Sequence, residues 1–505
     1  MAEKEFGREW TKRHAFQSAL LFLLHIVIFL GIAVILVLGD KFSDLRTYMR
    51  EEGANYLYAV FCILLLFLIT YLYFLFENKR ILTSGKNIAL IFTVLDLYLI
   101  FACLIGYKIS LYARPVALTA LLIFVLLGRR EAIFMNIVSA LLIFVLDTFA
   151  MPEVAIRECY SSLIISFSAG MLAIFLASKA KSRLKVVFIG VWIVVPMDLI
   201  IFLLEISNLI NKGVLAYDGS TQSTWNAIFM EMGYGLFGGV MSTVIFLACL
   251  PLFESIFNCL TVYRLRELTS SDARILKRLK EQAPGTYNHS VMVSQLAEAS
   301  AAAIGEDVDL ARAAALYHDV GKLHYPEHFT ENQGDYNLHD ELTPELSADI
   351  IRSHAKDGYA LIRNHHLPEF LADVALEHHG TLPIRYFYAK ALKLTDGELN
   401  IEDYSYLGPK PQTKLAAIVM ICDASEAAVR AVNARTPEET ERAIRGIIEE
   451  RMDLEQFAEC DITMADLTKI RMALVNTLSG VYHHRIQYPN IKYRTRGNGA
   501  KRDDV

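Results

Sequence analysis

Long apolar runs fill the first half of the chain, and short polar segments separate them. A helix needs about 20 apolar residues to cross the hydrocarbon core of a bilayer. Eight runs approach or exceed that length: residues 16–39, 55–76, 87–106, 111–128, 132–150, 160–177, 186–206 and 227–253. The pattern therefore predicts a bundle of about eight transmembrane helices over residues 16–253, preceded by a polar segment over residues 1–15.

Lysines and arginines indicate how this bundle is oriented in the membrane. Cytoplasmic loops carry an excess of basic residues. With the N-terminus inside, the inner segments hold thirteen lysines and arginines, and the outer segments hold seven, Arg114 among them. Eight spans return the chain to the side where it began. We therefore expect a multi-pass protein of the cell membrane, with both termini and the second half of the chain in the cytoplasm.

Five acidic residues lie within or at the ends of the apolar runs: Asp96, Asp147, Asp198, Glu205 and Glu231. A charge at membrane depth is costly, so acidic residues there often have a function. A structural role near the span ends and a role in sensing a signal are both compatible with the sequence.

The second half of the chain has shorter elements. Residues 254–283 are charged, with leucines at near-helical spacing, which indicates a helical connector. Thr343-Pro344 and Thr436-Pro437-Glu438-Glu439 are typical of helix starts, and long strand-like alternation is absent. We predict an all-α fold, in which an all-helical domain over residues 284–490 follows the membrane bundle and precedes a disordered tail over residues 491–505.

Composition narrows the class of protein further. Hydrophobic residues make up 54% of the chain, which agrees with a large membrane-embedded part. The formal net charge is −6, and a protein that binds nucleic-acid polymers is usually basic. We therefore expect no nucleic-acid polymer among its partners.

Side chains that can bind metal gather in the second half. Of 14 histidines, 12 lie between His289 and His484. In chain order the candidate ligands are His289, His318, Asp319, His354, His378, His379 and Asp423. Five imidazoles and two carboxylates suit two borderline divalent ions that share one carboxylate and leave positions open for water and substrate.

A polar stretch over residues 323–342 lies between two of these candidate ligands. It is too irregular for a helix, and long loops beside a metal site are commonly functional. We expect its three histidines to face solvent or substrate and not to bind metal: His324, His328 and His339.

Several motifs in residues 284–490 extend well beyond the candidate ligands. They include GTYNHSVMVSQLAEAS, YHDVGKLHYPEHFTENQ, EHHGTLPIRYFYAKAL and GPKPQTK. Together they resemble the membrane-bound 7TM-HD family of PgpH-type cyclic di-AMP phosphodiesterases, within the HD phosphohydrolase superfamily. GYGLFGGVMSTVIFLACLPLFESIF likewise resembles the last span of that family. Family members generally carry a large extracytoplasmic domain after the first span, and this chain has only about residues 40–54 in that place.

The resemblance implies a ligand set for each of two divalent ions, with Mn or Fe expected. One ion would bind His289, His318, Asp319 and Asp423. The other would bind His354, His378 and His379, with Asp319 bridging the two ions. Lys322, in HDVGK, would supply a positive charge to the substrate phosphate, beside the catalytic Asp319.

The resemblance also implies a reaction, the hydrolysis of cyclic di-AMP to linear 5′-pApA by an enzyme of the lipid bilayer. The sequence after His378-His379 lacks the DGxGYP signature of cyclic di-GMP hydrolases. Two alternatives stay open, an HD hydrolase of another nucleotide and a catalytically silent nucleotide-binding receptor. A homodimer through the membrane half is also compatible with the sequence. Candidate substrate contacts, by base stacking or by charge, are Arg385, Tyr386, Tyr388 and Lys390.

Overall fold

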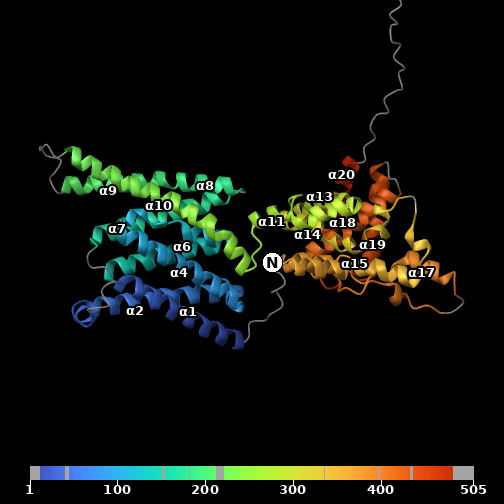
Figure 1. Ribbon diagram of the computed structural model, residues 1–505, viewed down its shortest axis with the longest axis horizontal. Coiled ribbons are helices and arrows are strands. Elements are labelled where there is room, and N and C mark those ends of the chain that lie inside the picture. The colour runs from blue at the N-terminus through green and yellow to red at the C-terminus, as the bar shows by residue number, and fades with distance from the viewer. Residues whose placement is uncertain are drawn as a thin grey trace, which may run out of the picture. The chain divides into compact units, whose positions relative to one another are not determined.

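A computed structural model describes most of the chain. The described residues are 12–39, 45–150, 154–180, 182–211, 221–334, 336–395, 398–432 and 436–481. Within them the protein is all-α, without strands, and a single bridge pairs Pro383 with Ser405. The chain divides into two compact units, Met1–Ala273 and Arg274–Val505 (Figure 1). The predicted fold class is confirmed, whereas the tail predicted over residues 491–505 and residues 1–11 of the N-terminal segment lie outside the described residues.

Long apolar helices dominate the first unit. In chain order its elements are α1 (Lys12–Leu38), α2 (Leu45–Glu77), α3 (Lys79–Thr83), α4 (Gly85–Lys108), η3 (Leu111–Ala113), α5 (Leu118–Leu126), α6 (Arg129–Val145), the π-helical η4 (Leu146–Ala150), α7 (Ile156–Ala177), α8 (Arg183–Trp192), α9 (Val194–Asn211), α10 (Thr221–Ile256) and α11 (Val262–Leu268). Seven segments of the described chain are long and apolar enough to cross a membrane, with α8 and α9 together forming one. Seven of the eight predicted spans are therefore confirmed as helices of sufficient length. Only six residues separate α1 from α2, so the chain has no domain between these two helices.

The predicted span over residues 111–128 has a different structure. Its helix α5 has only nine residues, about 14 Å at 1.5 Å per residue, against a hydrocarbon core about 30 Å thick. Leu118, Leu121 and Ile123 are completely buried, and α5 packs against α4, α6, α7 and α10. Because protein surrounds this segment, a broken backbone is tolerated at membrane depth.

Although α5 is too short to cross a bilayer, the first unit still begins and ends at the same end of the bundle. Figure 1 shows that the chain enters α1 and leaves α10 at the same end of the first unit. Two contacts join the turns at this end: Asn78 Nδ2 donates to Glu131 Oε1 at 2.6 Å, and the Tyr263 hydroxyl donates to the Ala180 carbonyl at 3.0 Å. The turns after α2, α5 and α7 carry basic residues that the sequence assigned to the inner side.

The position of Arg114 differs from the sequence-based prediction, which counted it among the basic residues of the outer loops. Its guanidinium is completely buried and donates to both carboxylate oxygens of Asp147, at 2.6 and 2.8 Å. The fold-back at η3 turns this side chain inward, which an apolar run alone does not reveal. Without Arg114, the segments that the sequence assigned to the outer side hold six basic residues, against thirteen in those assigned to the inner side.

The other acidic residues of the spans have varied surroundings. Glu231 accepts a hydrogen bond from the Ser110 hydroxyl at 3.0 Å, and Glu205 lies 4.0 Å from the guanidinium of Arg157. Asp96 and Asp198 each have a buried oxygen without a hydrogen-bond partner in the described part of the chain.

The second unit consists of shorter helices and several 3-10 turns. In chain order these are α12 (Arg274–Gln282), α13 (Pro284–Ile304), α14 (Val308–Tyr317), η5 (Val320–His324), η6 (Pro326–His328), η7 (Thr330–Asn332), η8 (Leu338–Asp340), α15 (Pro344–Asn364), α16 (Glu369–Glu377), α17 (Arg385–Leu392), η9 (Ile401–Tyr404), α18 (Lys414–Ala431), α19 (Pro437–Asp453) and α20 (Met464–Val481). Both predicted helix starts are confirmed. Thr343 caps α15, and Thr436 and Glu439 form a capping box at the start of α19.

Candidate metal centre

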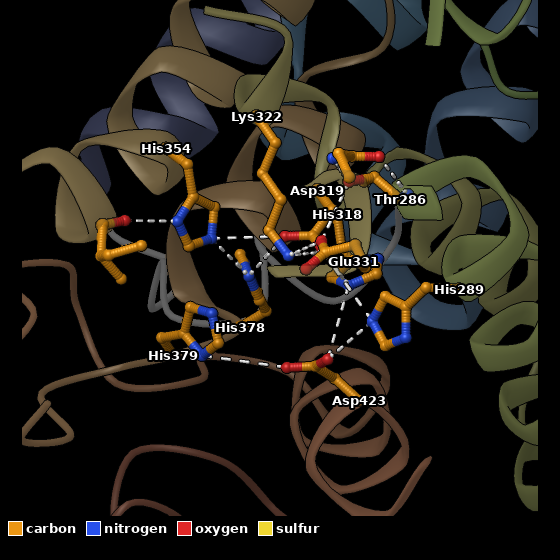
Figure 2. Close-up of polar contacts among 12 residues, drawn as sticks. Thr286, His289, His318, Asp319, Lys322, Glu331, His354, His378, His379 and Asp423 are labelled. Carbon is orange, nitrogen blue, oxygen red and sulfur yellow. Dashed lines mark hydrogen bonds and ion pairs between the residues drawn. The ribbon is translucent and has the colours of Figure 1, made fainter. Parts of the chain in front are cut away.

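Seven side chains from five helices of the second unit converge on one buried site, as Figure 2 shows. The helices are neighbours: α13 packs against α14 and α18, and α15 packs against α16 and η5. The seven residues come from α13, the end of α14, α15, the end of α16 and α18, and they are His289, His318, Asp319, His354, His378, His379 and Asp423. The structure therefore brings together every candidate ligand found in the sequence.

Gly321 lets the HDVGK segment reach α15. A Cβ at this position would overlap the carbonyl oxygen of His354 and crowd the nitrogen of Gly358. Without a side chain the η5 turn packs directly on the α15 backbone. This close approach sets Asp319 beside His354, although 35 residues separate them in the chain.

The seven side chains form two groups, and in each the ligand atoms lie within 4.8 Å of one another. One group is His289, His318 and Asp423, and the other is Asp319, His354, His378 and His379. The carboxylate of Asp319 lies between the groups. Its Oδ2 is 3.3 Å from His318 Nε2, and its Oδ1 is 3.3 Å from His354 Nε2 and 3.6 Å from His378 Nε2.

Backbone carbonyls orient three of the imidazoles. The Nδ1 atoms of His318, His354 and His378 lie 2.6 to 2.8 Å from the carbonyl oxygen three residues earlier in the chain. A carbonyl oxygen only accepts hydrogen bonds, so each Nδ1 carries the proton. The Nε2 atoms therefore point into the site, which is the arrangement found for metal-ligating histidines.

His289 is oriented by a carboxylate that the sequence did not reveal. Its Nδ1 lies 2.8 Å from Glu426 Oε2, and its Nε2 lies 2.9 Å from Asp423 Oδ1. Glu426 is buried and follows Asp423 by three residues, so the two carboxylates share one face of α18. The three-residue spacing from Asp423 was the sequence feature that could have identified Glu426. Glu377, which precedes His378 in the chain, accepts a hydrogen bond from the Gln412 backbone N–H at 3.0 Å.

The two groups differ in electrostatics. Burial opposes the charged imidazole, but its hydrogen bonds to the carboxylates of Asp423 and Glu426 raise the pKa of His289 to about 8. Burial also acts on His318, yet the charge of Asp319 raises its pKa to about 10. Burial instead lowers the pKa of His354 to about 3. Protons therefore compete with metal for the imidazoles of His289 and His318.

Unpaired polar atoms at the centre fit bound metal. His318 Nε2 and both carboxylate oxygens of Asp319 are buried and make no hydrogen bond within the described ranges, although Lys322 Nζ lies 2.7 Å from Asp319 Oδ2. Buried polar atoms without partners are rare in proteins. Imidazole and carboxylate ligands suit divalent ions, so the residues present fit a pair of such ions.

Lys322 borders this centre. Its ammonium lies 2.7 Å from Asp319 Oδ2, 2.8 Å from Glu331 Oε1 and 4.9 Å from the ring centre of Phe329. Burial opposes the charge, but the two carboxylates raise the pKa of Lys322 above its usual range. The side chain is therefore a fixed positive charge beside the seven residues.

The predicted substrate contacts on α17 have other partners. Arg385 pairs with Glu450 at 2.6 Å, and Lys390 donates to the carbonyl of His339 at 3.2 Å. Tyr386 is 63% exposed, whereas Tyr388 packs against a small core around Phe387. Within the described residues, none of the hydrogen bonds, ion pairs or ring contacts of these four side chains reaches the seven at the centre.

The ring of Tyr406, beside the site, was not anticipated from the sequence. Tyr406 stacks on His379, with ring centres 4.2 Å apart, because its backbone N–H donates to the Leu382 carbonyl at 3.0 Å. His339, expected to face solvent or substrate, is 3% exposed and lies 5.0 Å from the ring centre of Phe387. Its Nε2 is 2.8 Å from the His328 carbonyl oxygen.

Comparisons with known proteins identify both units. Residues 54–261 match the family described as 7TM receptor with intracellular HD hydrolase, and residues 286–428 match the HD domain. The chain is 35% identical over 422 residues to the cyclic-di-AMP phosphodiesterase PgpH of Bacillus subtilis (strain 168), which covers 82% of this chain and 56% of that protein. It is 44% identical over 292 residues to PgpH of Listeria monocytogenes serotype 1/2a (strain 10403S), which covers 58% of this chain and 40% of that protein.

A solved structure also matches. It is the HD domain of L. monocytogenes phosphodiesterase PgpH in complex with cyclic-di-AMP, at 50% identity and a TM-score of 0.41, covering 42% of this chain and 99% of that one. The chain spans about half the length of the curated relatives it matches. From the matches to both family models and the curated relatives, together with seven helices suited to span a bilayer, this chain is a multi-pass membrane protein that belongs to the 7TM-HD family.

Proposed function

We propose that this chain is an integral membrane phosphodiesterase that hydrolyses cyclic di-AMP to linear 5′-pApA at a site for two divalent ions, Mn or Fe. The position of Asp319 is the observation that carries the proposal. Its two oxygens face two separate groups of imidazoles, each about 3.3 Å away at the nearest nitrogen. A carboxylate in that position can bridge two ions, which a single-ion site does not require.

Each of the seven residues then has a role. His289, His318 and Asp423 would hold one ion, His354, His378 and His379 would hold the other, and Asp319 would be shared. When bound, such a pair of ions activates a water molecule and neutralises phosphate oxygens. Glu426 keeps the His289 ring in place. Lys322 supplies one more positive charge for the phosphate, from the edge of the site.

The substrate assignment comes from the relatives. The two PgpH proteins are cyclic-di-AMP phosphodiesterases, and residues 286–428 of this chain, which contain the seven candidate ligands, match the HD domain. Arg385, Tyr386, Tyr388 and Lys390 remain candidates for contact with the nucleotide. A homodimer through the membrane helices also remains a prediction.

The same proposal places the HD domain and both termini in the cytoplasm. The basic residues of the turns after α2, α5 and α7 lie at the end of the bundle where α1 begins and α10 leaves. Cysteine introduced at exposed Lys179, after α7, should resist a membrane-impermeant thiol reagent added to intact cells. Cysteine at exposed Lys108, the last residue of α4, should react. The opposite labelling would contradict this orientation.

A substrate panel tests the activity. The full chain in detergent micelles would receive Mn²⁺ or Fe²⁺ and then cyclic di-AMP, cyclic di-GMP or pApA, with products separated by chromatography. We expect conversion of cyclic di-AMP to pApA and no turnover of the other two. Cleavage of a different nucleotide would favour a broader HD hydrolase, and binding without any cleavage would favour a silent receptor.

A further inference from the structure

A network of hydrogen bonds fastens the polar loop after HDVGK to the start of α13. The Thr286 backbone N–H donates to Asn332 Oδ1 at 3.1 Å. The Thr286 hydroxyl accepts from Asn332 Nδ2 at 2.8 Å and donates to Glu331 Oε1 at 2.9 Å. A Cβ at Gly285 would overlap the carbonyl oxygen of Glu331, so only glycine permits this approach. Glu331 is thereby fixed in place beside the metal centre (Figure 2).

The same oxygen of Glu331 also accepts a hydrogen bond from Lys322. The ammonium lies 2.8 Å from Glu331 Oε1 and 2.7 Å from Asp319 Oδ2, so two carboxylates share it almost equally. The side chains of Lys322 and Glu331 are each 13% exposed. Only one of the two carboxylates belongs to the ligand groups, because Glu331 is in neither of them.

Lys322 and a metal ion would compete for one oxygen. Asp319 Oδ2 is the oxygen that faces His318, at 3.3 Å, and that would reach an ion of the His289 group. Like charges repel strongly at separations of a few ångströms in a site with little water. When metal occupies Asp319, the ammonium therefore needs another anion within reach, and Glu331 is already in contact with it.

We infer that Glu331 is a positioning residue, which holds the Lys322 ammonium when Asp319 binds metal and keeps that charge at the edge of the site for the substrate phosphate. The inference rests on the two-metal site of the proposed function. Without the charge of Glu331, Lys322 has Asp319 as its remaining anionic partner and acts as a competitor of the metal. Loss of Glu331 should then weaken metal binding, and should do so only while Lys322 is present.

A double-mutant cycle on metal affinity tests this role. Mn²⁺ binding would be measured by calorimetry on the metal-free full chain in detergent, without nucleotide, for the wild type, Glu331→Gln, Lys322→Met and the double variant. Glutamine still accepts the Thr286 hydrogen bond, so the loop stays fastened. We expect Glu331→Gln to weaken Mn²⁺ binding about tenfold, in the range found for groups around metal ligands. Both chains with Lys322→Met should bind Mn²⁺ at least as tightly as the wild type.

The matched control is Glu327→Gln, in an exposed position of the same loop, which should leave Mn²⁺ affinity unchanged. Wild-type affinity in Glu331→Gln would overturn the inference. An equal loss with and without Lys322 would also overturn it, because Glu331 would then act on the loop and not through the ammonium. Since no nucleotide is present, a wrong substrate assignment does not affect the result. A wild-type chain that binds no Mn²⁺ would instead refute the metal site.

Discussion

Two clusters of buried charge, one in each unit, differ in how their polar atoms are paired. In the first unit, both oxygens of Asp147 accept hydrogen bonds from Arg114, and one accepts from Tyr107 as well. The Arg114 Nε donates to the Ala102 carbonyl at 3.0 Å. In the second unit, Asp319 Oδ1 and His318 Nε2 are buried without a hydrogen bond within the described ranges, and Asp319 Oδ2 lies 2.7 Å from the ammonium of Lys322.

This difference in pairing separates a cluster with a structural role from a cluster suited to bind metal. A polar network whose members satisfy one another holds a single arrangement and needs no ligand. Here the network joins the fold-back after η3 to α4 and η4 through Arg114. A buried cluster with unpaired acceptors and aligned imidazole nitrogens is complete only with cations. An acidic residue in an apolar setting is therefore weak evidence for a function until its partners are known.

The largest effect should come from removing the shared carboxylate. Asp319→Ala leaves both groups of imidazoles without their common ligand, so cyclic di-AMP hydrolysis should fall by about a thousandfold or more. Bound Mn²⁺, measured by mass spectrometry, should fall with it. Asp349→Ala removes a surface carboxylate paired with Arg352 and serves as the control. Near-normal turnover in Asp319→Ala would refute the two-metal assignment.

Changes at the Arg114–Asp147 pair should alter the free energy of unfolding. Arg114→Met leaves Asp147 buried without its cation, and breaking one side of such a pair destabilises by about 3–5 kcal/mol. The double variant Arg114→Met, Asp147→Leu should recover most of this loss, because no unpaired charge remains. Unfolding of the full chain in detergent measures both. A double variant no more stable than Arg114→Met would contradict the view that this pair is purely architectural.

A smaller effect should follow from the carboxylate behind His289. Glu426→Gln keeps an acceptor for the His289 Nδ1 proton but removes the charge, so Mn²⁺ affinity should fall about tenfold. Arg430→Gln, which alters only a 3.7 Å contact to Glu426, is the matched comparison and should change affinity little. Equal affinities in wild type and Glu426→Gln would show that the charge does not tune this ligand.

The smallest effect on turnover should come from the largest deletion. All seven ligand candidates lie in the compact unit that begins at Arg274. A fragment of residues 274–505 should therefore hydrolyse cyclic di-AMP at a rate close to that of the full chain. A fragment with a native helical circular dichroism spectrum but no activity would show that the membrane unit is needed for catalysis.

Residue type and spacing were enough to single out seven candidate ligands that the structure brings together, because histidine pairs and an HD motif indicate metal binding without reference to tertiary structure. They predicted less where distant segments meet. Tyr406 reaches His379 only because residues 404–406 pair with residues 382–384. Arg114 turns inward only because η3 folds back, and a long apolar run does not reveal such a break. Glu426 was within reach of sequence reasoning through its helical spacing from Asp423.

A metal titration of the full chain would test the two-ion hydrolysis most directly. Mn²⁺ would be added in steps to the metal-free chain in detergent, with cyclic di-AMP present and pApA formation followed by chromatography. We expect no product without metal, and a plateau at two ions bound per chain. A plateau at one ion per chain, or pApA formed by the metal-free chain, would contradict the bridging role of Asp319 and the function proposed from it.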